Sequence, residues 1–281
     1  GLGVMGYPMA GYISKAGHNV TVFNRTKSKA EKWIGEYKGK IAETPEEAAK
    51  DAEYIFTCVG NDNDLREVTF GNNGIFKSIK KGSVYVDNTT ASATIAREIY
   101  DYSKKNGFGF LDAPVSGGQA GAENGALTVM IGGDQADFEK AKDKIDCYSK
   151  KMKLLGNAGS GQLAKMVNQI CIAGLVQGLS EAINFGMKAG LNMEDVIEVI
   201  SKGAAQSWQM ENRYKTMIAD KFDFGFAVDW MRKDLKIAME EAKNNGSLLP
   251  VTELVDKFYE EVQDMGGNRW DTSSLIKRFR R

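Results

Sequence analysis

Histidine is almost absent from this sequence, since His18 is the single one among 281 residues. Enzymes that use a histidine base, a histidine-bound metal ion or a Ser/His/Asp triad therefore have at most one residue to offer. His18 ends the segment Ala16-Gly17-His18, which is typical of a turn between a helix and a strand, so we expect it to have a structural role. Proton transfer near neutral pH is then left to lysine, tyrosine, cysteine or a carboxylate.

Cysteine and net charge are also low. The three cysteines, Cys58, Cys147 and Cys171, have spacings that match neither a zinc site nor a disulfide framework. Cys58 and Cys171 lie in apolar runs, where buried thiols are common, and this favours a reducing compartment. The 37 basic residues balance the 37 acidic ones, so no net field attracts nucleic acid or anionic lipid.

Long apolar runs are scarce as well. We expect no stretch of the roughly 18 to 20 apolar residues that a bilayer-spanning helix needs, and no charged-then-apolar leader. These features together predict a cytoplasmic protein whose partner is a small molecule, with no nucleic-acid partner and no membrane partner.

Two styles of sequence follow one another along the chain. Up to about Gly156, short β-rich runs alternate with helical patterns, which is typical of a parallel sheet with crossover helices. The predicted strands are Val20–Phe23, Tyr54–Val59, Val84–Asp87, Gly109–Leu111, Leu127–Ile131 and Met152–Leu155. From Gln162 to Met187 the chain has neither proline nor a strong turn signal, and the later patterns are also helical. We therefore expect an α/β fold, with a Rossmann-type doubly wound sheet in residues 1–157 joined by a long helix to an all-helical domain in residues 158–281.

Local signals mark where several helices begin. Thr44-Pro45-Glu46-Glu47 combines a cap residue, a proline at the first helical position and a glutamate three residues after the cap. Asn192 can cap another helix, and Pro250 stands where a first helical turn would begin. After the long helix, the sequence predicts helices at Met193–Ser201, Trp208–Ile218, Ala227–Lys243 and Val251–Met265.

The chain begins with a glycine motif, Gly1-Leu2-Gly3-Val4-Met5-Gly6, ahead of a predicted helix over Tyr7–Lys15 and the strand Val20–Phe23. In such a motif the first glycine permits a tight turn, the second lets a pyrophosphate approach the backbone, and the third lets helix and strand pack closely. An ordinary glycine turn would look the same, but the helix and strand that follow favour a dinucleotide site. The strand expected before the motif is not in the numbered chain, which starts on the first glycine.

The segment Asn24-Arg25-Thr26 bears on which dinucleotide is bound. NAD-binding enzymes usually place Asp or Glu there, to accept hydrogen bonds from the ribose 2′-OH. A carboxylate would repel a 2′-phosphate, whereas Arg25 can bind one through two hydrogen bonds and stack on adenine. A solvated basic loop would give the same pattern. The sequence favours NADP over NAD, and Val59-Gly60, at another predicted strand end, is expected to border the cofactor.

Two lysines compete for the proton-transfer role. Tyr100-x-x-x-Lys104 has the spacing used by short-chain dehydrogenases, but it lies near the end of a predicted helix, where Lys104 can offset the helix dipole. Lys165 lies early in the long helix, after Gly159-Ser160-Gly161, and Asn168 is expected on the same helical face. Apolar neighbours would desolvate the Lys165 ammonium and help it exchange protons. Spacing alone leaves its role open, because most helical lysines face solvent.

The order of motifs resembles that of the β-hydroxyacid dehydrogenases, a family of 3-hydroxyisobutyrate dehydrogenases, tartronate semialdehyde reductases and glyoxylate/succinic semialdehyde reductases. The motifs that carry the resemblance are Gly1–Gly6, Ala16–His18 with Asn24–Thr26, Asp112–Gly118, Gly159–Asn168 and Lys233–Leu235. The resemblance implies a Rossmann domain, a long helix and a helical domain, with the active site in the cleft between the domains. It also implies a homodimer or homotetramer formed through the helical domain.

By this resemblance, Lys165 is the general acid and base, and Asn168 hydrogen-bonds the substrate. The segment Ser116-Gly117-Gly118 would bind the substrate carboxylate through backbone N–H groups and the serine hydroxyl, which makes physical sense because glycines expose amides to an anion. An ordinary glycine-rich turn after a strand is the alternative.

Further residues follow from the same resemblance. Thr90, in Asp87-Asn88-Thr89-Thr90, would lie near the nicotinamide ribose and the substrate, although Thr89 stands where the family has serine. Phe226, Lys233 and Asp234 would close over the nicotinamide and substrate, unless they are a core aromatic and a solvated charge pair.

We therefore expect an NADP-preferring oxidoreductase that interconverts a small β-hydroxy acid and its semialdehyde or keto form by hydride transfer, with Lys165 moving the hydroxyl proton. An imine-reductase-like enzyme or a noncatalytic nucleotide-binding scaffold on the same fold is the alternative. Both would be expected to have lost Lys165, or, for the scaffold, Asn168.

Overall fold

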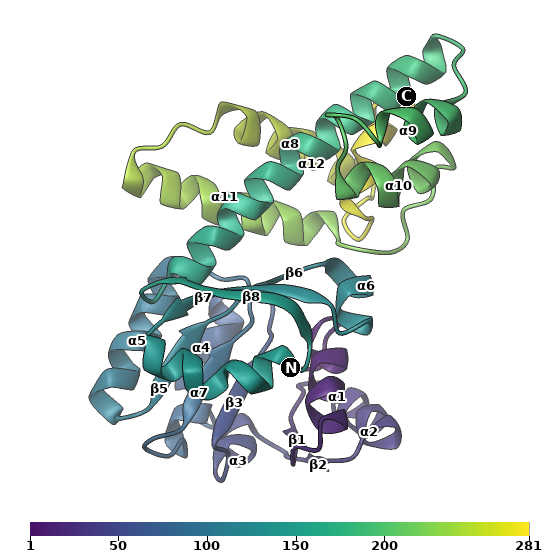
Figure 1. Cartoon of the computed structure of the whole chain (residues 1–281). Helices are drawn as coiled ribbons and strands as arrows, with labels where there is room; N and C mark the ends of the chain where they lie inside the picture. The colour runs from purple at the N-terminus through teal and green to yellow at the C-terminus, as the bar shows by residue number, and fades with distance from the viewer. Residues whose placement is uncertain (281) are drawn as a thin grey trace. The chain divides into compact units, whose positions relative to one another are not determined.

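The computed structural model describes residues 1–280, which form two compact units. The first unit ends at Lys165 and contains both helices and strands, whereas the second begins at Met166 and is helical (Figure 1). The division falls inside helix α8 (Ser160–Lys188), and the predicted boundary at Asn157 lies just ahead of that helix. The predicted combination of a doubly wound sheet and an all-helical region is confirmed.

The main sheet of the first unit has six strands in the order β3-β4-β5-β7-β6, with β8 paired to β7. Their bounds are β3 (Tyr54–Thr57), β4 (Val84–Asp87), β5 (Gly109–Asp112), β6 (Val115–Ser116), β7 (Leu127–Gly133) and β8 (Ser149–Gly156). Strands β3, β4 and β5 are parallel, as are β7 and β8, but β7 is antiparallel to β5 and β6. The prediction of a wholly parallel sheet is therefore wrong at β7. A parallel return needs a crossover of about a dozen residues or more, and only the short helix α6 (Gly118–Glu123) separates β6 from β7.

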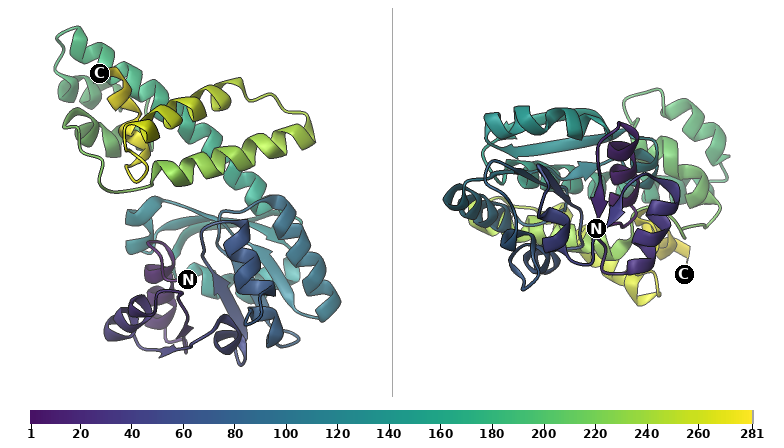
Figure 2. Two further views of the ribbon diagram at one scale, coloured as in Figure 1. Left: turned by 180° about the vertical axis from the view of Figure 1, so that it is seen from behind. Right: turned by 90° about the horizontal axis from the view of Figure 1, so that it is seen from below.

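Helices cover both faces of this sheet. Besides α6 and the start of α8, the helices of the first unit are α1 (Gly6–Lys15), α2 (Lys27–Glu36), α3 (Pro45–Ala49), α4 (Asp62–Phe70), α5 (Ala93–Asn106) and α7 (Gln135–Asp146), with a short 3₁₀ turn, η1 (Ile75–Lys77). Of these, α2 packs not on the main sheet but in a separate apolar cluster with Leu2 and Val22. Side chains alternate along β4, so Val84 and Val86 join the apolar cluster that includes α1 and α7, whereas Tyr85 joins the cluster that includes α4 and α5. Figure 1 shows α7 in front of the sheet. The view from behind in Figure 2 shows the blue helices α4 and α5 in front of it.

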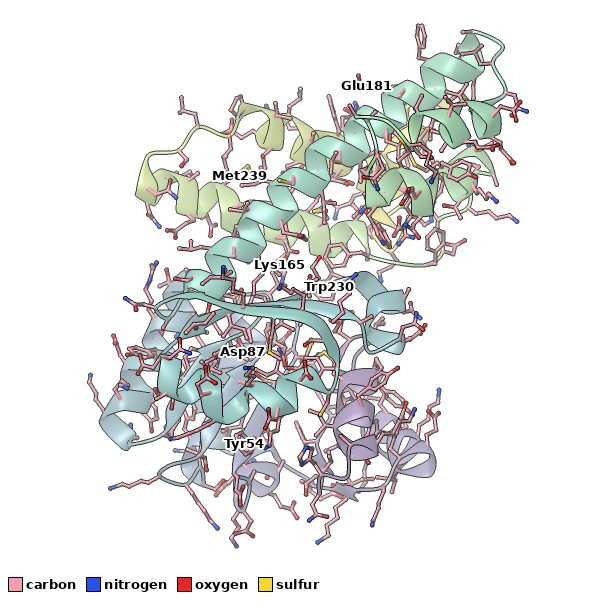
Figure 3. All side chains as sticks on the ribbon, viewed as in Figure 1. Tyr54, Asp87, Lys165, Glu181, Trp230 and Met239 are labelled. Atoms are coloured by element: carbon pink, nitrogen blue, oxygen red, sulfur yellow. The ribbon has the colours of Figure 1, made fainter. Side chains whose placement is uncertain are left out.

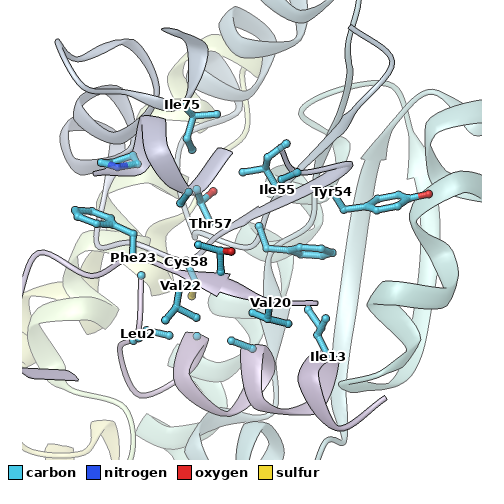
Figure 4. Close-up of a pocket in the computed structure, with 18 of the residues that line it drawn as sticks. Leu2, Ile13, Val20, Val22, Phe23, Tyr54, Ile55, Thr57, Cys58 and Ile75 are labelled. Carbon is cyan, nitrogen blue, oxygen red and sulfur yellow. The ribbon is translucent and has the colours of Figure 1, made fainter. Parts of the chain in front are cut away.

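Strands β1 (Thr21–Val22) and β2 (Lys40–Ile41) form a separate parallel pair. A cavity of about 900 Å³ separates this pair from β3, and aliphatic side chains such as Leu2, Val22 and Ile55 line it (Figure 4). A doubly wound sheet places a strand between these two positions, so the cavity is a gap in the sheet and not a ligand pocket.

The second unit is built around α8 and contains α9 (Met193–Ile200), α10 (Trp208–Ile218), α11 (Val228–Asn245), α12 (Pro250–Asp264) and the 3₁₀ segment η2 (Thr272–Arg280). One apolar cluster joins α8 to α11 and α12, and another joins α8 to α9 and α10. By length and composition α8 could cross a membrane, a test that core helices of soluble proteins also pass. The expectation that no stretch reaches this length was therefore wrong, as was the predicted burial of Cys171, which is exposed on α8.

Candidate active site

The glycine loop at the start of α1 has the shape that a dinucleotide requires. A Cβ atom on Gly1 would lie 2.5 Å from the carbonyl oxygen of Cys58, and a Cβ atom on Gly6 would collide with the carbonyl oxygen of Gly1. The first and third glycines are thus required for packing. A Cβ atom on Gly3 would meet nothing within 4 Å, so the backbone there is open to a ligand. The loop therefore fits a pyrophosphate at the N-terminus of α1.

Asn24 connects the glycine loop to the end of β1. The backbone N–H of Leu2 donates to Asn24 Oδ1 at 2.8 Å, and Asn24 Nδ2 donates to the carbonyl oxygen of Thr26 at 2.9 Å. The next side chain, Arg25, is 89% exposed, with its Nη1 3.3 Å from Asp64 Oδ1. An ion pair this exposed contributes at most about 1 kcal/mol, so the Arg25 guanidinium is accessible to a charged ligand.

The ends of β3 and β4 are cross-linked beside this loop. The N–H of Val59 donates to Thr89 Oγ1 at 3.0 Å, and the N–H of Thr89 donates to Asp87 Oδ1 at 3.0 Å. Thr57 Oγ1 donates to the same carboxylate oxygen at 2.7 Å. Burial raises the pKa of Asp87 to about 7, although these hydrogen bonds oppose the shift. The predicted cofactor segments Val59-Gly60 and Asp87–Thr90 therefore lie together.

Asp112 joins the end of β5 to the first turn of α8. Its Oδ1 accepts from the N–H of Gly159 at 2.7 Å, and its Oδ2 accepts from the N–H of Gln162 at 2.9 Å. Burial raises the pKa of Asp112 to about 6, and these backbone hydrogen bonds oppose the shift. Lys165 follows nearly one turn later and is 6% exposed. In Figure 3 the order upward is Tyr54 at the start of β3, Asp87 at the end of β4 and then Lys165, which therefore lies beyond the carboxyl ends of these strands.

The segment Ser116-Gly117-Gly118 leaves β6 in a conformation that only glycine adopts readily. The φ angle of Gly117 is 135° and that of Gly118 is 62°. A Cβ atom on Gly118 would meet nothing within 4 Å, so the backbone is open on that side. Exposed amides of this kind suit a carboxylate ligand.

In the second unit, Asn168 is oriented by the buried Gln169, which is itself bound to Asp234. Its Nδ2 donates to Gln169 Oε1 at 2.8 Å, and Gln169 Nε2 donates to Asp234 Oδ2 at 2.6 Å. Gln169 and Asp234 are each 1% exposed, and Lys233 Nζ lies 3.1 Å from Asp234 Oδ1. The sequence predicted no role for Gln169. The signal available for it was a second amide side chain directly after Asn168 on a mainly apolar helix.

Phe226 lies two residues before α11 and is partly buried against an apolar cluster. Its N–H donates to Asp271 Oδ2 at 3.0 Å, and Arg213 Nε lies 3.2 Å from Asp271 Oδ1. Asp271 is 1% exposed, so the backbone position of Phe226 is fixed from within the second unit.

The competing pair Tyr100 and Lys104 lies at the end of α5. Tyr100 Oη donates to Asp134 Oδ1 at 2.9 Å, and Lys104 Nζ donates to Asp134 Oδ2 at 2.6 Å. These hydrogen bonds raise the pKa of both Tyr100 and Lys104, so both groups hold their protons more tightly. His18 lies in the turn after α1, where its N–H donates to the carbonyl oxygen of Ile13. Among residues 1–280, no group of three or more histidine, cysteine or carboxylate side chains could hold a metal ion.

Comparisons with known proteins cover the whole arrangement. Residues 1–156 match the family described as the NAD binding domain of 6-phosphogluconate dehydrogenase, and residues 159–279 match the family described as NAD-binding of NADP-dependent 3-hydroxyisobutyrate dehydrogenase. An uncharacterized oxidoreductase of Shewanella frigidimarina is 63% identical over 279 residues, which are 99% of this chain and 96% of the relative. The 2-hydroxy-3-oxopropionate reductase of Escherichia coli is 34% identical over 284 residues, covering 99% of this chain and 94% of that one.

Among solved structures, 3-hydroxyisobutyrate dehydrogenase of Mycobacterium tuberculosis, solved with L-serine, superimposes with a TM-score of 0.89 at 27% identity. This match covers 100% of this chain and 97% of that one. The resemblance predicted from the sequence motifs is therefore confirmed. The chain belongs to the β-hydroxyacid dehydrogenase family and is an NAD(P)-dependent oxidoreductase.

Proposed function

We propose that the protein is an NADP-preferring dehydrogenase that interconverts a small β-hydroxy acid and its semialdehyde or keto form, with Lys165 as general acid and base. Family membership supports NAD(P)-dependent hydroxyacid dehydrogenase activity, and the names of the relatives from E. coli and M. tuberculosis support a small hydroxy acid as substrate. The observation that carries the proposal is the burial of Lys165, 6% exposed, on α8 beyond the carboxyl ends of β3 and β4. Lysine side chains are rarely buried to this extent, and a buried lysine at this place in the fold calls for a function.

The cofactor is assigned to the residues that the family motifs indicate. They are Gly1-Leu2-Gly3-Val4-Met5-Gly6, Asn24, Arg25, Thr26, Val59, Gly60, Thr90 and Lys233. The exposed guanidinium of Arg25 and the absence of a carboxylate in Asn24-Arg25-Thr26 support NADP, whereas the nearby carboxylate of Asp64 would weaken binding of a 2′-phosphate. NAD is the less favoured alternative. The bound nicotinamide would supply or accept the hydride.

The substrate is assigned to two groups of side chains and amides. The backbone N–H groups and hydroxyl of Ser116-Gly117-Gly118 bind its carboxylate, and Asn168 hydrogen-bonds its reacting oxygen. Thr90, Phe226 and Asp234 complete the site. Binding at the carboxylate and at the reacting oxygen would hold a small hydroxy acid at both ends, and such orientation accounts for much of the rate enhancement in enzymes of this kind.

The chemistry required of Lys165 is proton transfer. In the oxidation direction its uncharged amine accepts the proton of the substrate hydroxyl as the hydride leaves the adjacent carbon. In the reduction direction its ammonium returns that proton to the carbonyl oxygen. Burial limits exchange with bulk water, so the proton passes between Lys165 and the substrate.

The test begins with a screen of small hydroxy acids and semialdehydes with both cofactors, followed by variants measured on the best substrate. Lys165→Ala is expected to lower kcat by about 10²- to 10⁴-fold, with cofactor affinity changed less than about twofold. Lys165→Arg should rescue poorly, because a guanidinium scarcely deprotonates and its planar shape differs from that of an ammonium.

Lys104→Ala is the control, since Lys104 is bound to Asp134 and has no assigned part in the reaction. It should retain the kcat of the wild-type protein. If Lys165→Ala kept most of its kcat and Lys104→Ala did not, proton transfer would have to be assigned to the Tyr100–Lys104 pair.

A further inference from the structure

The side chain of Gln162 binds the backbone on both sides of Thr90. Its Nε2 donates to the carbonyl oxygen of Thr89 at 2.8 Å, and its Oε1 accepts from the N–H of Ala91 at 3.0 Å. Gln162 is 1% exposed, so neither bond competes with water. The segment that carries Thr90 is thus bound at two points to the first turn of α8.

The backbone of Gln162 is held as firmly as its side chain. Its N–H donates to the buried carboxylate of Asp112 at 2.9 Å. At the preceding position, a Cβ atom on Gly161 would lie 2.5 Å from the carbonyl oxygens of both Asp112 and Met130, so this turn of α8 packs directly on the end of β5 and the middle of β7. The turn therefore has little room to shift.

Lys165 is three residues after Gln162 on the same helix. Three residues of an α-helix rise about 4.5 Å and bring the two side chains to neighbouring positions on one face. The bonds of Gln162 therefore fix where the Lys165 backbone stands relative to Thr90.

We propose that Gln162 is a positioning residue that sets the alignment of Lys165 with the Thr90 segment, and hence with the nicotinamide and substrate. The inference rests on the proposed function, because this alignment affects catalysis only if Lys165 transfers the proton. Glutamine suits the role because its amide can donate to one peptide group and accept from another at the same time. A glutamate carboxylate cannot donate to the Thr89 oxygen, and methionine replaces neither hydrogen bond.

The variants that test this inference are Gln162→Met and Gln162→Glu. Both are expected to lower kcat by about tenfold or more, because small misplacements of a catalytic group cost up to about 100-fold. The KM for cofactor should change less than about threefold, since the glycine loop and Arg25 are untouched. In Gln162→Glu, the ratio of variant to wild-type kcat should rise as pH falls, because a protonated carboxyl can again donate to Thr89.

A buried glutamine on the same helix provides the matched control. Gln177 is 7% exposed and its Nε2 donates to Glu181 within α8, so Gln177→Met removes a hydrogen bond without touching the Thr90 segment. It should keep the kcat of the wild-type protein. A fall in kcat of Gln177→Met equal to that of Gln162→Met would overturn the inference, because any buried glutamine of α8 would then matter equally.

Amide hydrogen exchange gives a readout that does not depend on activity. The N–H of Ala91 should exchange faster in Gln162→Met than in the wild-type protein, whereas the N–H of Val59, bonded to Thr89 Oγ1, should change less. Unchanged kcat and unchanged exchange at Ala91 in Gln162→Met would refute the positioning role. That result is distinct from failure of the proposed function, which is decided by Lys165→Ala.

Discussion

Asp87 is expected to make the stability of the first unit depend on pH. It is 1% exposed at the end of β4, and burial raises the pKa of its carboxyl from 3.8 to about 7. Between these two pH values the folded protein holds a proton that the unfolded chain has released. The free energy of unfolding should therefore fall as the pH rises from about 4 to about 7.

Replacing Asp87 by Asn removes this titration with little change in shape. Both Thr57 and Thr89 donate to Oδ1 of Asp87, and the amide oxygen of Asn can accept both hydrogen bonds. The pKa shift from 3.8 to about 7 is ~3 pH units at about 1.4 kcal/mol each. The free energy of unfolding of the wild-type protein should therefore fall by up to roughly 4 kcal/mol because of Asp87, and this decrease should be absent from the variant. Asp112, whose pKa burial raises to about 6, acts in the same direction, so part of the pH dependence should remain.

The assay is urea denaturation of the wild-type protein, Asp87→Asn and Asp51→Asn at several values from about pH 4.5 to 8. Asp51 is an exposed control, because its hydrogen bond to Lys80 lowers its pKa and keeps it ionised over this range. The free energy of unfolding should depend less steeply on pH in Asp87→Asn and as steeply as wild type in Asp51→Asn. An unchanged slope in Asp87→Asn would refute the reasoning, since the proton would then bind elsewhere.

Three further expectations follow from the site and the second unit. Arg25→Asp should raise the Kd for NADP far more than that for NAD, and equal losses would show that Arg25 does not meet a 2′-phosphate. Gln169→Leu removes the acceptor that orients Asn168, and it should lower kcat/KM by about tenfold with cofactor affinity unchanged; a wild-type kcat/KM would exclude this role. We also expect a homodimer or homotetramer formed through the second unit, where Phe185 and Val199 are each 72% exposed. A monomeric mass by light scattering at micromolar concentration would contradict that assembly.

Local sequence determined much of the fold. The helix predicted at Trp208–Ile218 is α10 with the same bounds, and Thr44 caps α3 by accepting from the N–H of Glu47 at 3.0 Å. Such features follow from residues within one or two turns of each other, so a single sequence contains the whole signal. The same holds for Gly6, which is required by its packing on Gly1, whereas Gly1 is required by contact with the distant Cys58. The spacing of residues around Lys165 left its role open. The order of motifs along the chain then indicated the family and, by resemblance, the role of Lys165.

Only the tertiary structure decided the features that join distant parts of the chain. The direction of β7 depends on the short connection through α6, which no pattern in the strand itself records. Gln162 binds Thr89 across 73 residues, and Gln169 binds Asp234 across 65. The physical reason is that a buried amide gains its role from the peptide group or carboxylate that folding brings to it. The sequence by itself therefore determined the helices of the second unit, most strands and the family motifs, whereas the hydrogen-bonding partners of Gln162 and Gln169 arose only from the packing of elements far apart in the chain.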